Sequence, residues 1–77
     1  IYPNPVQDVL HVAIDMAAVK NIRMELFDLN SILVYRKEFK QIQTTNDDIY
    51  VNGFAPGEYF LRITVDKVSN TFKVIVK

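Results

Sequence analysis

Apolar and polar residues alternate with a period of two along most of this chain, and that period constrains its fold more than any other feature. In the segment EYFLRITVD, Tyr59, Leu61, Ile63 and Val65 share one face, while the residues between them share the other. Successive side chains of a β-strand point to opposite faces of its sheet, so this pattern predicts a strand with one buried face. The chain is therefore predicted to be all-β.

Shorter segments of the same kind recur along the sequence, separated by turn residues. Strands are predicted at about Val9–Ile14, in IRMELFD, over Ile32–Phe39, in DIYVN, in EYFLRITVD and in TFKVIVK, with a further edge pairing near Ile42. This spacing favours an Ig-like antiparallel β-sandwich of six to seven short strands, although the paired cysteines and tryptophan of antibody domains are missing.

The segments between the predicted strands carry turn chemistry. MAAVKN is predicted to be a connector able to form one helical turn, and KQIQTTNDD is predicted to be a polar loop. In the hairpin turn DLNS, Asn30 is expected to tolerate a positive φ. In FAPG, Pro56 sets its own φ and Gly57 is expected to adopt the left-handed conformation that other residues resist.

Length, charge and cysteine content limit the function. The chain has 77 residues, nine Lys or Arg against nine Asp or Glu, and no cysteine. This length allows a single domain, residues 1–77, with little room for an internal active site. Balanced charge argues against a nucleic-acid partner, and apolar runs far shorter than roughly 20 residues argue against membrane insertion. The first residue is Ile1 rather than methionine, so we expect a domain cut from a longer parent protein.

Catalysis finds no support in the residue pattern. The single histidine, His11, is expected on the outer face of the first strand, with no second histidine or cysteine to complete a zinc site. Ser31 and Ser69 lack the G-x-S-x-G context of a serine nucleophile. We therefore expect a protein that is not an enzyme, with no catalytic residue, no metal and no cofactor.

Two binding hypotheses stay open at this point. The oxygen-rich segments DLNS and TTNDD, which includes Asp47 and Asp48, could help bind calcium, although turns favour the same residues. Tyr35, Tyr50 and Phe60 are expected to be exposed and could form a platform for sugars. An Ig-like or fibronectin-type adhesive or carbohydrate-binding module is therefore the alternative interpretation.

Three blocks of sequence give a more specific interpretation. YPNP leading into VQDVLHV, MELFDLNSILV, and VNGFAPGEYFLRI followed by FKVIVK lie in an order and spacing that resembles the type A C-terminal sorting domain of the type IX secretion system. The resemblance covers essentially the whole chain. Two positions depart from the family pattern, since Ser31 stands where the family often has glycine and Phe54 where it often has leucine.

The resemblance implies a non-catalytic C-terminal signal domain of an exported protein in bacteria of the Bacteroidetes type. Such a domain is recognised by secretion machinery at the outer membrane. It directs its cargo across that membrane to the cell surface and is typically removed by a sortase-like peptidase, which joins the cargo to a lipopolysaccharide anchor. The implied partners are the outer-membrane machinery and this peptidase.

The same resemblance implies which residues carry the signal. They lie in the last two predicted strands and are Gly57, Tyr59, Leu61, Lys73, Val74, Ile75, Val76 and Lys77. A motif at the N-terminal boundary consists of Tyr2, Pro3, Asn4 and Pro5. A last strand with an unpaired edge could also be extended by a partner or by a second copy, giving an edge-strand homodimer.

Overall fold

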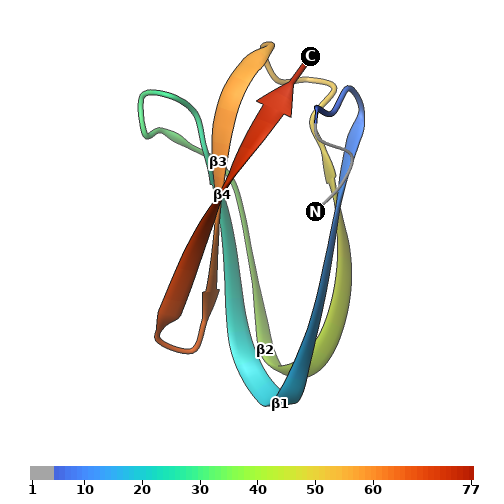
Figure 1. Cartoon of the computed structure of the whole chain (residues 1–77), viewed down its shortest axis with the longest axis vertical. Helices are drawn as coiled ribbons and strands as arrows, with labels where there is room; N and C mark the ends of the chain where they lie inside the picture. The colour runs from blue at the N-terminus through green and yellow to red at the C-terminus, as the bar shows by residue number, and fades with distance from the viewer. Residues whose placement is uncertain (1–4) are drawn as a thin grey trace.

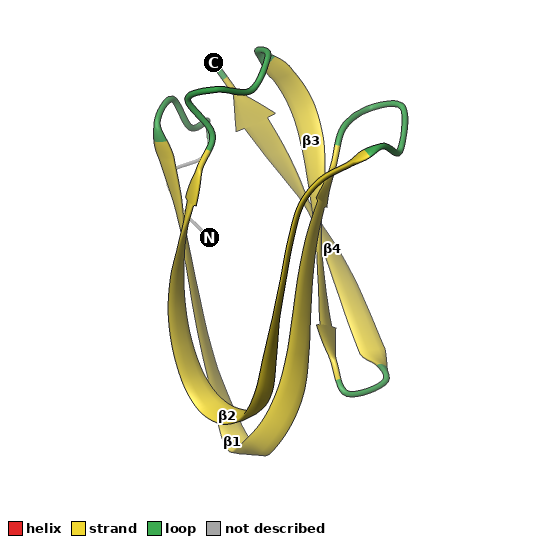
Figure 2. Ribbon diagram, turned by 180° about the vertical axis from the view of Figure 1, so that it is seen from behind, coloured by secondary structure: helices red, strands yellow, loops and turns green. Residues whose placement is uncertain are grey.

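Residues 5–77 are described by the computed structural model, and they form one antiparallel sheet of four strands (Figure 1). The strands are β1 (Val9–Phe27), β2 (Leu33–Tyr50), β3 (Gly57–Val65) and β4 (Val68–Val76). Their order across the sheet is β2-β1-β3-β4, and loops alone connect them (Figure 2). Within the described residues, no helix could cross a lipid bilayer.

The β1–β2 hairpin is bent into a U whose two arms face each other (Figure 1). β3 pairs only with the second arm of β1, from Ile22 to Phe27, and β4 pairs with β3. At the bend the pairing shifts register: residues 16–19 of β1 stand opposite residue 43 of β2 alone. Extra residues on one strand of a pair bend that strand and increase its twist. This irregularity turns one long hairpin into two facing arms.

Asn21 joins the bend to the neighbouring segments. Its side-chain oxygen accepts a hydrogen bond from the Gln41 backbone nitrogen at 3.0 Å, and its own backbone nitrogen donates to Asp66 Oδ1 at 3.1 Å. Its carbonyl accepts from the Asp66 backbone nitrogen at 2.9 Å. Gln41 and Asp66 both have positive φ, which costs about 1–2 kcal/mol in a residue other than glycine. The Asn21 bonds help offset that cost.

The hydrophobic core lies between the two arms. Its buried members come from both arms of the hairpin, from β3 and β4, and from the segments beside them: Val6, Leu10, Val12, Ile22, Met24, Leu26, Ile49, Val51, Tyr59, Leu61, Ile63, Val74 and Val76. The predicted inward face of EYFLRITVD is confirmed at Tyr59, Leu61 and Ile63, while Val65 is half-buried. On β4, Val74 and Val76 are buried, whereas Phe72 is 42% exposed.

Besides the core, polar contacts between two parts of β2 hold the arms together. Tyr35 lies in the arm that contains Leu26 and donates a hydrogen bond from its hydroxyl to Oδ2 of Asp47, in the arm that contains Val12, at 2.6 Å. Lys37 Nζ lies 3.0 Å from Asp47 Oδ1. Twelve residues of straight strand would span roughly 40 Å, so this contact requires the bend. Burial, with the hydrogen bond and charge of Asp47, raises the pKa of the Tyr35 phenol well above its usual range.

The all-β, antiparallel class is confirmed, whereas the Ig-like sandwich of six to seven short strands is not, since the described residues form one sheet of four strands. MAAVKN, predicted to be a connector, lies in β1, and KQIQTTNDD, predicted to be a polar loop, lies in β2. Each merges two predicted strands into one. The physical reason is that backbone pairing continues around the bend, where most side chains face solvent and the apolar alternation is therefore lost.

Candidate functional site

The sorting residues implied by the resemblance lie side by side on the β3–β4 hairpin. Gly57 pairs with Val76, and Tyr59 pairs with Val74. Most of these side chains point into the core: Tyr59, Leu61, Val74 and Val76 are all buried. Gly57 is exposed and has φ of 149°, a conformation that other residues rarely adopt, so the positive φ expected there is confirmed.

Tyr59 anchors the turn that precedes β3. Its hydroxyl donates a hydrogen bond to the carbonyl oxygen of Ala55 at 2.6 Å, and its ring stacks on Phe54 at 5.7 Å between centroids. A buried tyrosine whose hydroxyl returns to the backbone a few residues upstream fixes the path of that turn. In the described geometry, Tyr59 therefore holds the FAPG turn against the core.

The end of β4 is paired on its outer edge as well. The Val6 backbone nitrogen donates to the Ile75 carbonyl at 2.8 Å, and the Lys77 nitrogen donates to the Val6 carbonyl at 2.9 Å, forming a parallel bridge between Val6 and Val76. Lys73 is exposed and pairs with Glu58 at 3.0 Å. The outer edge of the last strand is thus covered at its C-terminal end, where we had expected unpaired backbone groups.

Of the N-terminal boundary motif, Tyr2, Pro3 and Asn4 lie outside the described residues. Pro5 is exposed and directly precedes the bridge made by Val6. Because proline has no backbone N–H, Pro5 cannot donate to a further strand at this point.

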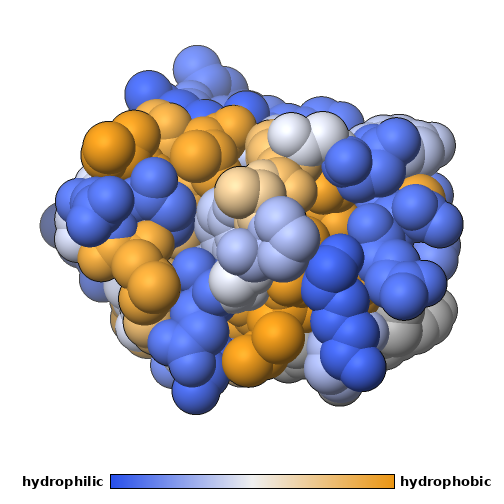
Figure 3. Space-filling view, turned by 90° about the horizontal axis from the view of Figure 1, so that it is seen from above, coloured by the Kyte–Doolittle hydropathy of each residue, from blue (hydrophilic) through white to orange (hydrophobic). Residues whose placement is uncertain are grey.

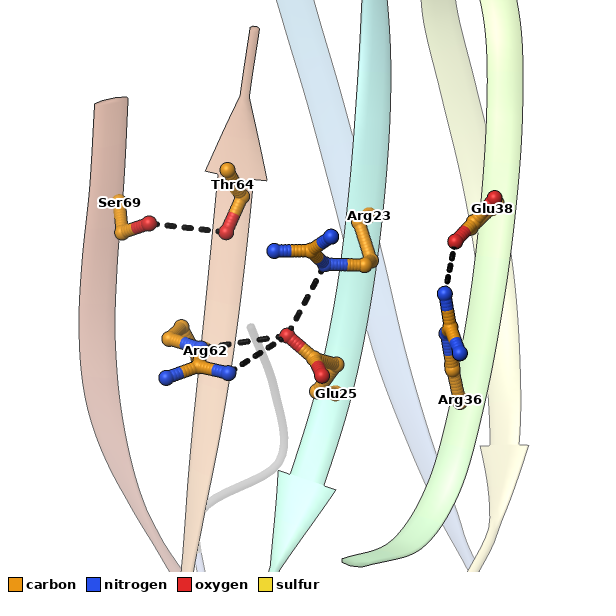
Figure 4. Close-up of polar contacts among 7 residues, drawn as sticks. All are labelled: Arg23, Glu25, Arg36, Glu38, Arg62, Thr64 and Ser69. Atoms are coloured by element: carbon orange, nitrogen blue, oxygen red, sulfur yellow. Dashed lines mark hydrogen bonds and ion pairs between the residues drawn. The ribbon is translucent and has the colours of Figure 1, made fainter. Parts of the chain in front are cut away.

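A charged network covers the outer face of the sheet, on the side away from the core (Figure 4). Glu25 is 9% exposed, and its Oε1 accepts from Arg62 Nη2 at 2.9 Å and from Arg23 Nε at 3.1 Å. Burial raises the pKa of the Glu25 carboxyl, but hydrogen bonds and charge from Arg62 and Arg23 outweigh it and hold the pKa below its usual range. Glu25 therefore accepts these hydrogen bonds as a carboxylate held in one position.

Two further contacts extend this outer face. Arg36 bonds to Glu38 on β2, and the hydroxyls of Thr64 and Ser69 lie 2.9 Å apart across β3 and β4. The Arg62 guanidinium also lies 5.0 Å from the centre of the Phe27 ring, within the range of a cation–π interaction. Alternation places all these side chains outward, but the sequence alone did not indicate which strands are neighbours, so we did not predict the network.

The residues considered for calcium already have protein partners. Asp28 Oδ1 accepts from the backbone nitrogens of Asn30 and Ile32. Asp47 bonds to Tyr35 and Lys37, and Asp48 Oδ1 lies 2.7 Å from His11 Nδ1. Among residues 5–77, no group of three or more acidic, histidine or cysteine side chains is placed to hold a metal ion.

The three aromatic residues considered for sugar binding do not share one face. Tyr50 is 67% exposed, as expected. Tyr35 is half-buried rather than exposed, because it stands opposite the buried Leu26 and its hydroxyl points toward Asp47. Phe60 lies on the outer face, because its neighbours Tyr59 and Leu61 point inward. These rings therefore do not form a platform.

Comparison with known proteins assigns the chain to a family over its full length. The model of the secretion system C-terminal sorting domain matches residues 1–77. No curated protein and no solved structure matches the chain.

Proposed function

Because this chain belongs to the family of type IX secretion C-terminal sorting domains, we propose that it carries an attached cargo across the outer membrane and is then cut off by a sortase-like peptidase. Family membership makes the domain a sorting signal for export to the cell surface or outside. The observation that carries the proposal is that the family match extends over residues 1–77.

The geometry supports a signal that acts as a folded domain. We assign Gly57, Tyr59, Leu61, Val74 and Val76 the role of holding the β3–β4 hairpin in shape, since four of these side chains are buried and Gly57 has a positive φ. Their loss would then impair sorting through loss of the fold. Lys73, Ile75 and Lys77 belong to the same hairpin and complete the proposed signal.

A homodimer through the edge of β4 is a weaker part of this proposal. The Ile75 carbonyl and the Lys77 nitrogen are already bonded to Val6. A second copy would therefore pair along the Ser69–Thr71 part of β4, or along the outer edge of β2.

The test is a fusion of the domain to the C-terminus of a periplasm-targeted reporter, expressed in a type IX host and in the same host lacking the secretion system. We expect surface delivery only in the intact host. Mass spectrometry of the surface reporter should show that the domain has been removed, and deletion of the peptidase should leave it attached. A reporter that stays in the periplasm of both hosts would overturn the proposal.

Deleting Thr71–Lys77 is not sufficient as a test of the signal, because it removes Val74 and Val76 from the core. Substitution of the exposed Lys73 by Ala, paired with Val74→Asp, separates the two roles. If sorting needs the folded hairpin, Val74→Asp abolishes delivery. If the exposed lysine is itself recognised, Lys73→Ala reduces delivery while the unfolding midpoint in urea stays near that of the wild type.

A further inference from the structure

Three aliphatic side chains lie exposed within five residues at the loop between β1 and β2. Leu29 is 62% exposed, Ile32 58% and Leu33 43%. We call these three residues the apolar tip. Single exposed aliphatic residues are ordinary on protein surfaces, whereas a cluster at one place marks an interaction site. The loop projects from the sheet at the end opposite the bend (Figure 1).

The apolar tip sits on a loop that is held rigid. Asp28 Oδ1 accepts hydrogen bonds from the backbone nitrogens of Asn30 and Ile32, at 2.9 and 3.0 Å. The Asp28 backbone also bonds to Ser31 and Ile32, each at 3.0 Å. A loop fixed in one conformation loses little entropy when a partner binds it, so this arrangement favours recognition.

The tip continues into an aromatic groove on the outer face. A shallow groove of about 290 Å³ is lined by Phe27, Leu29, Phe60, Arg62 and Thr71, with Asp28 and Ser31 at its loop end. Phe27 and Phe60 are paired neighbours on β1 and β3. Seen from the end where the loop lies, apolar surface gathers beside polar patches (Figure 3). Leu29 belongs to both the tip and the groove, and the Arg62 guanidinium lies in the lining of the groove.

Charge distinguishes the kind of partner. The ion pairs of this face join four cations, Arg23, Arg36, Arg62 and Lys73, to three anions, Glu25, Glu38 and Glu58, which leaves one excess positive charge. Arg23 and Arg62 share the buried Glu25, so the extra cation lies at the strand end of the groove, while Asp28 places a carboxylate at its loop end. The loop itself, DLNSIL, carries an acid and no basic residue, which disfavours the headgroups of an anionic membrane.

We propose that the apolar tip and the adjoining Phe27–Phe60 groove form the surface by which the secretion machinery recognises this domain. The partner is a protein with an apolar pocket for Leu29 and Ile32 and a carboxylate at the rim of that pocket, facing Arg62. This inference rests on the proposed function. It differs from that function in placing recognition on the β1–β2 loop and on the outward side chains beside it, which are other residues than those that the family resemblance indicated.

The chain provides matched controls for a test. Val19, at the bend, and Val68, at the β3–β4 turn, are 59% and 65% exposed, as exposed as the tip residues but at the other end of the molecule. The experiment compares reporter fusions carrying Leu29→Asp, Ile32→Asp, Arg62→Gln, Val19→Asp or Val68→Asp with the wild-type fusion. Surface delivery is measured in the type IX host, and urea unfolding of each purified domain checks its fold.

We expect at least a tenfold loss of delivery for Leu29→Asp and Ile32→Asp, a smaller loss for Arg62→Gln, and delivery near wild type for Val19→Asp and Val68→Asp. Unfolding midpoints of the two tip variants should match that of the wild type. Normal delivery by the tip variants would overturn the inference and leave the proposed function standing. Equal losses in tip and control variants would overturn it too. A wild-type fusion that is not delivered would overturn the proposed function and, with it, this inference.

Sedimentation with vesicles of phosphatidylcholine and phosphatidylglycerol tests the other class of partner. The protein-partner proposal expects the wild-type domain to stay in the supernatant. If the wild-type domain sediments with the vesicles and Leu29→Asp abolishes this, the partner of the apolar tip is a membrane and the proposal is overturned.

Discussion

The two faces of the β3 strand differ in what each alternate residue does. Tyr59, Leu61 and Ile63 point inward and are buried among residues from every strand. Phe60 and Arg62, between them, face outward into the aromatic groove and the Glu25 network. Substitutions at two adjacent positions of β3 therefore test different properties of the domain. The inner face determines whether the domain folds, and the outer face determines what a folded domain presents.

The largest effect is expected on the inner face. Leu61→Ala should lower the free energy of unfolding by about 2–5 kcal/mol, because it leaves a cavity in a fully buried site. Urea denaturation followed by circular dichroism measures this change. Thr71→Ala, at an exposed position of β4, serves as the control and should change the free energy by less than about 0.5 kcal/mol. Similar values for the two variants would contradict the division between the faces.

A smaller effect is expected where the two arms of β2 meet. Tyr35→Phe should cost about 1.5 kcal/mol, because the hydroxyl donates to the carboxylate of the buried Asp47. Urea denaturation again measures the change. Tyr50→Phe is the matched control, since Tyr50 is largely exposed, and it should leave the unfolding midpoint unchanged. An unchanged midpoint for Tyr35→Phe would show that packing alone closes the arms.

The contribution of the outer face to stability should depend on pH. The pKa of Glu25 is held below its usual range in the folded state, so its carboxylate stabilises the fold above the unfolded pKa, and this contribution is lost as pH falls through the folded pKa. We expect Glu25→Gln to be less stable by about 1 kcal/mol at pH 7. The difference in free energy of unfolding between the wild type and Glu25→Gln should become smaller below about pH 4.3.

Urea unfolding at several pH values from 7 to 3 measures this gap. Glu38→Gln removes an exposed ion pair and should cost only about 0.5 kcal/mol or less at any pH. A gap for Glu25→Gln that is independent of pH would mean that the side chain acts through packing.

The smallest effect concerns the loop that carries the apolar tip. Ser31 has φ of 63°, a region where glycine is favoured. Ser31→Gly should therefore raise stability by about 0.5 kcal/mol, the relief of strain exceeding the added entropy of the unfolded chain. Asn30→Gly, where φ is not positive, should lower stability slightly. Differential scanning calorimetry of both variants measures the change in stability. A Ser31→Gly variant less stable than Asn30→Gly would contradict the prediction.

The inner face was largely predictable from the sequence, because burial imposes a period of two. The inward positions of Tyr59, Leu61 and Ile63 follow from alternation alone, and the structure confirms each of them. The residue with positive φ in the hairpin turn was predicted less well. Asn30 was expected to tolerate it, but Ser31 adopts it, at the position where the family often has glycine.

The bend and the outer face could not be predicted from one sequence. Solvent-exposed strands such as those through Ala17 and Thr44 need no apolar pattern, so their pairing leaves no periodic signal. The Glu25 network depends on β1 and β3 being neighbours although they are separated by β2 in the chain. Single-sequence patterns indicate which way a side chain points in a strand, and they do not indicate what stands opposite it.

The bridge between Val6 and Val76 has a consequence for the timing of folding. Val6 and Val76 are both core residues, separated by nearly the whole chain, and β4 can pair only after β3 has been made. Contacts of such high sequence separation form late, because the intervening chain must first be ordered. During synthesis the domain therefore cannot complete its core until residue 76 has emerged.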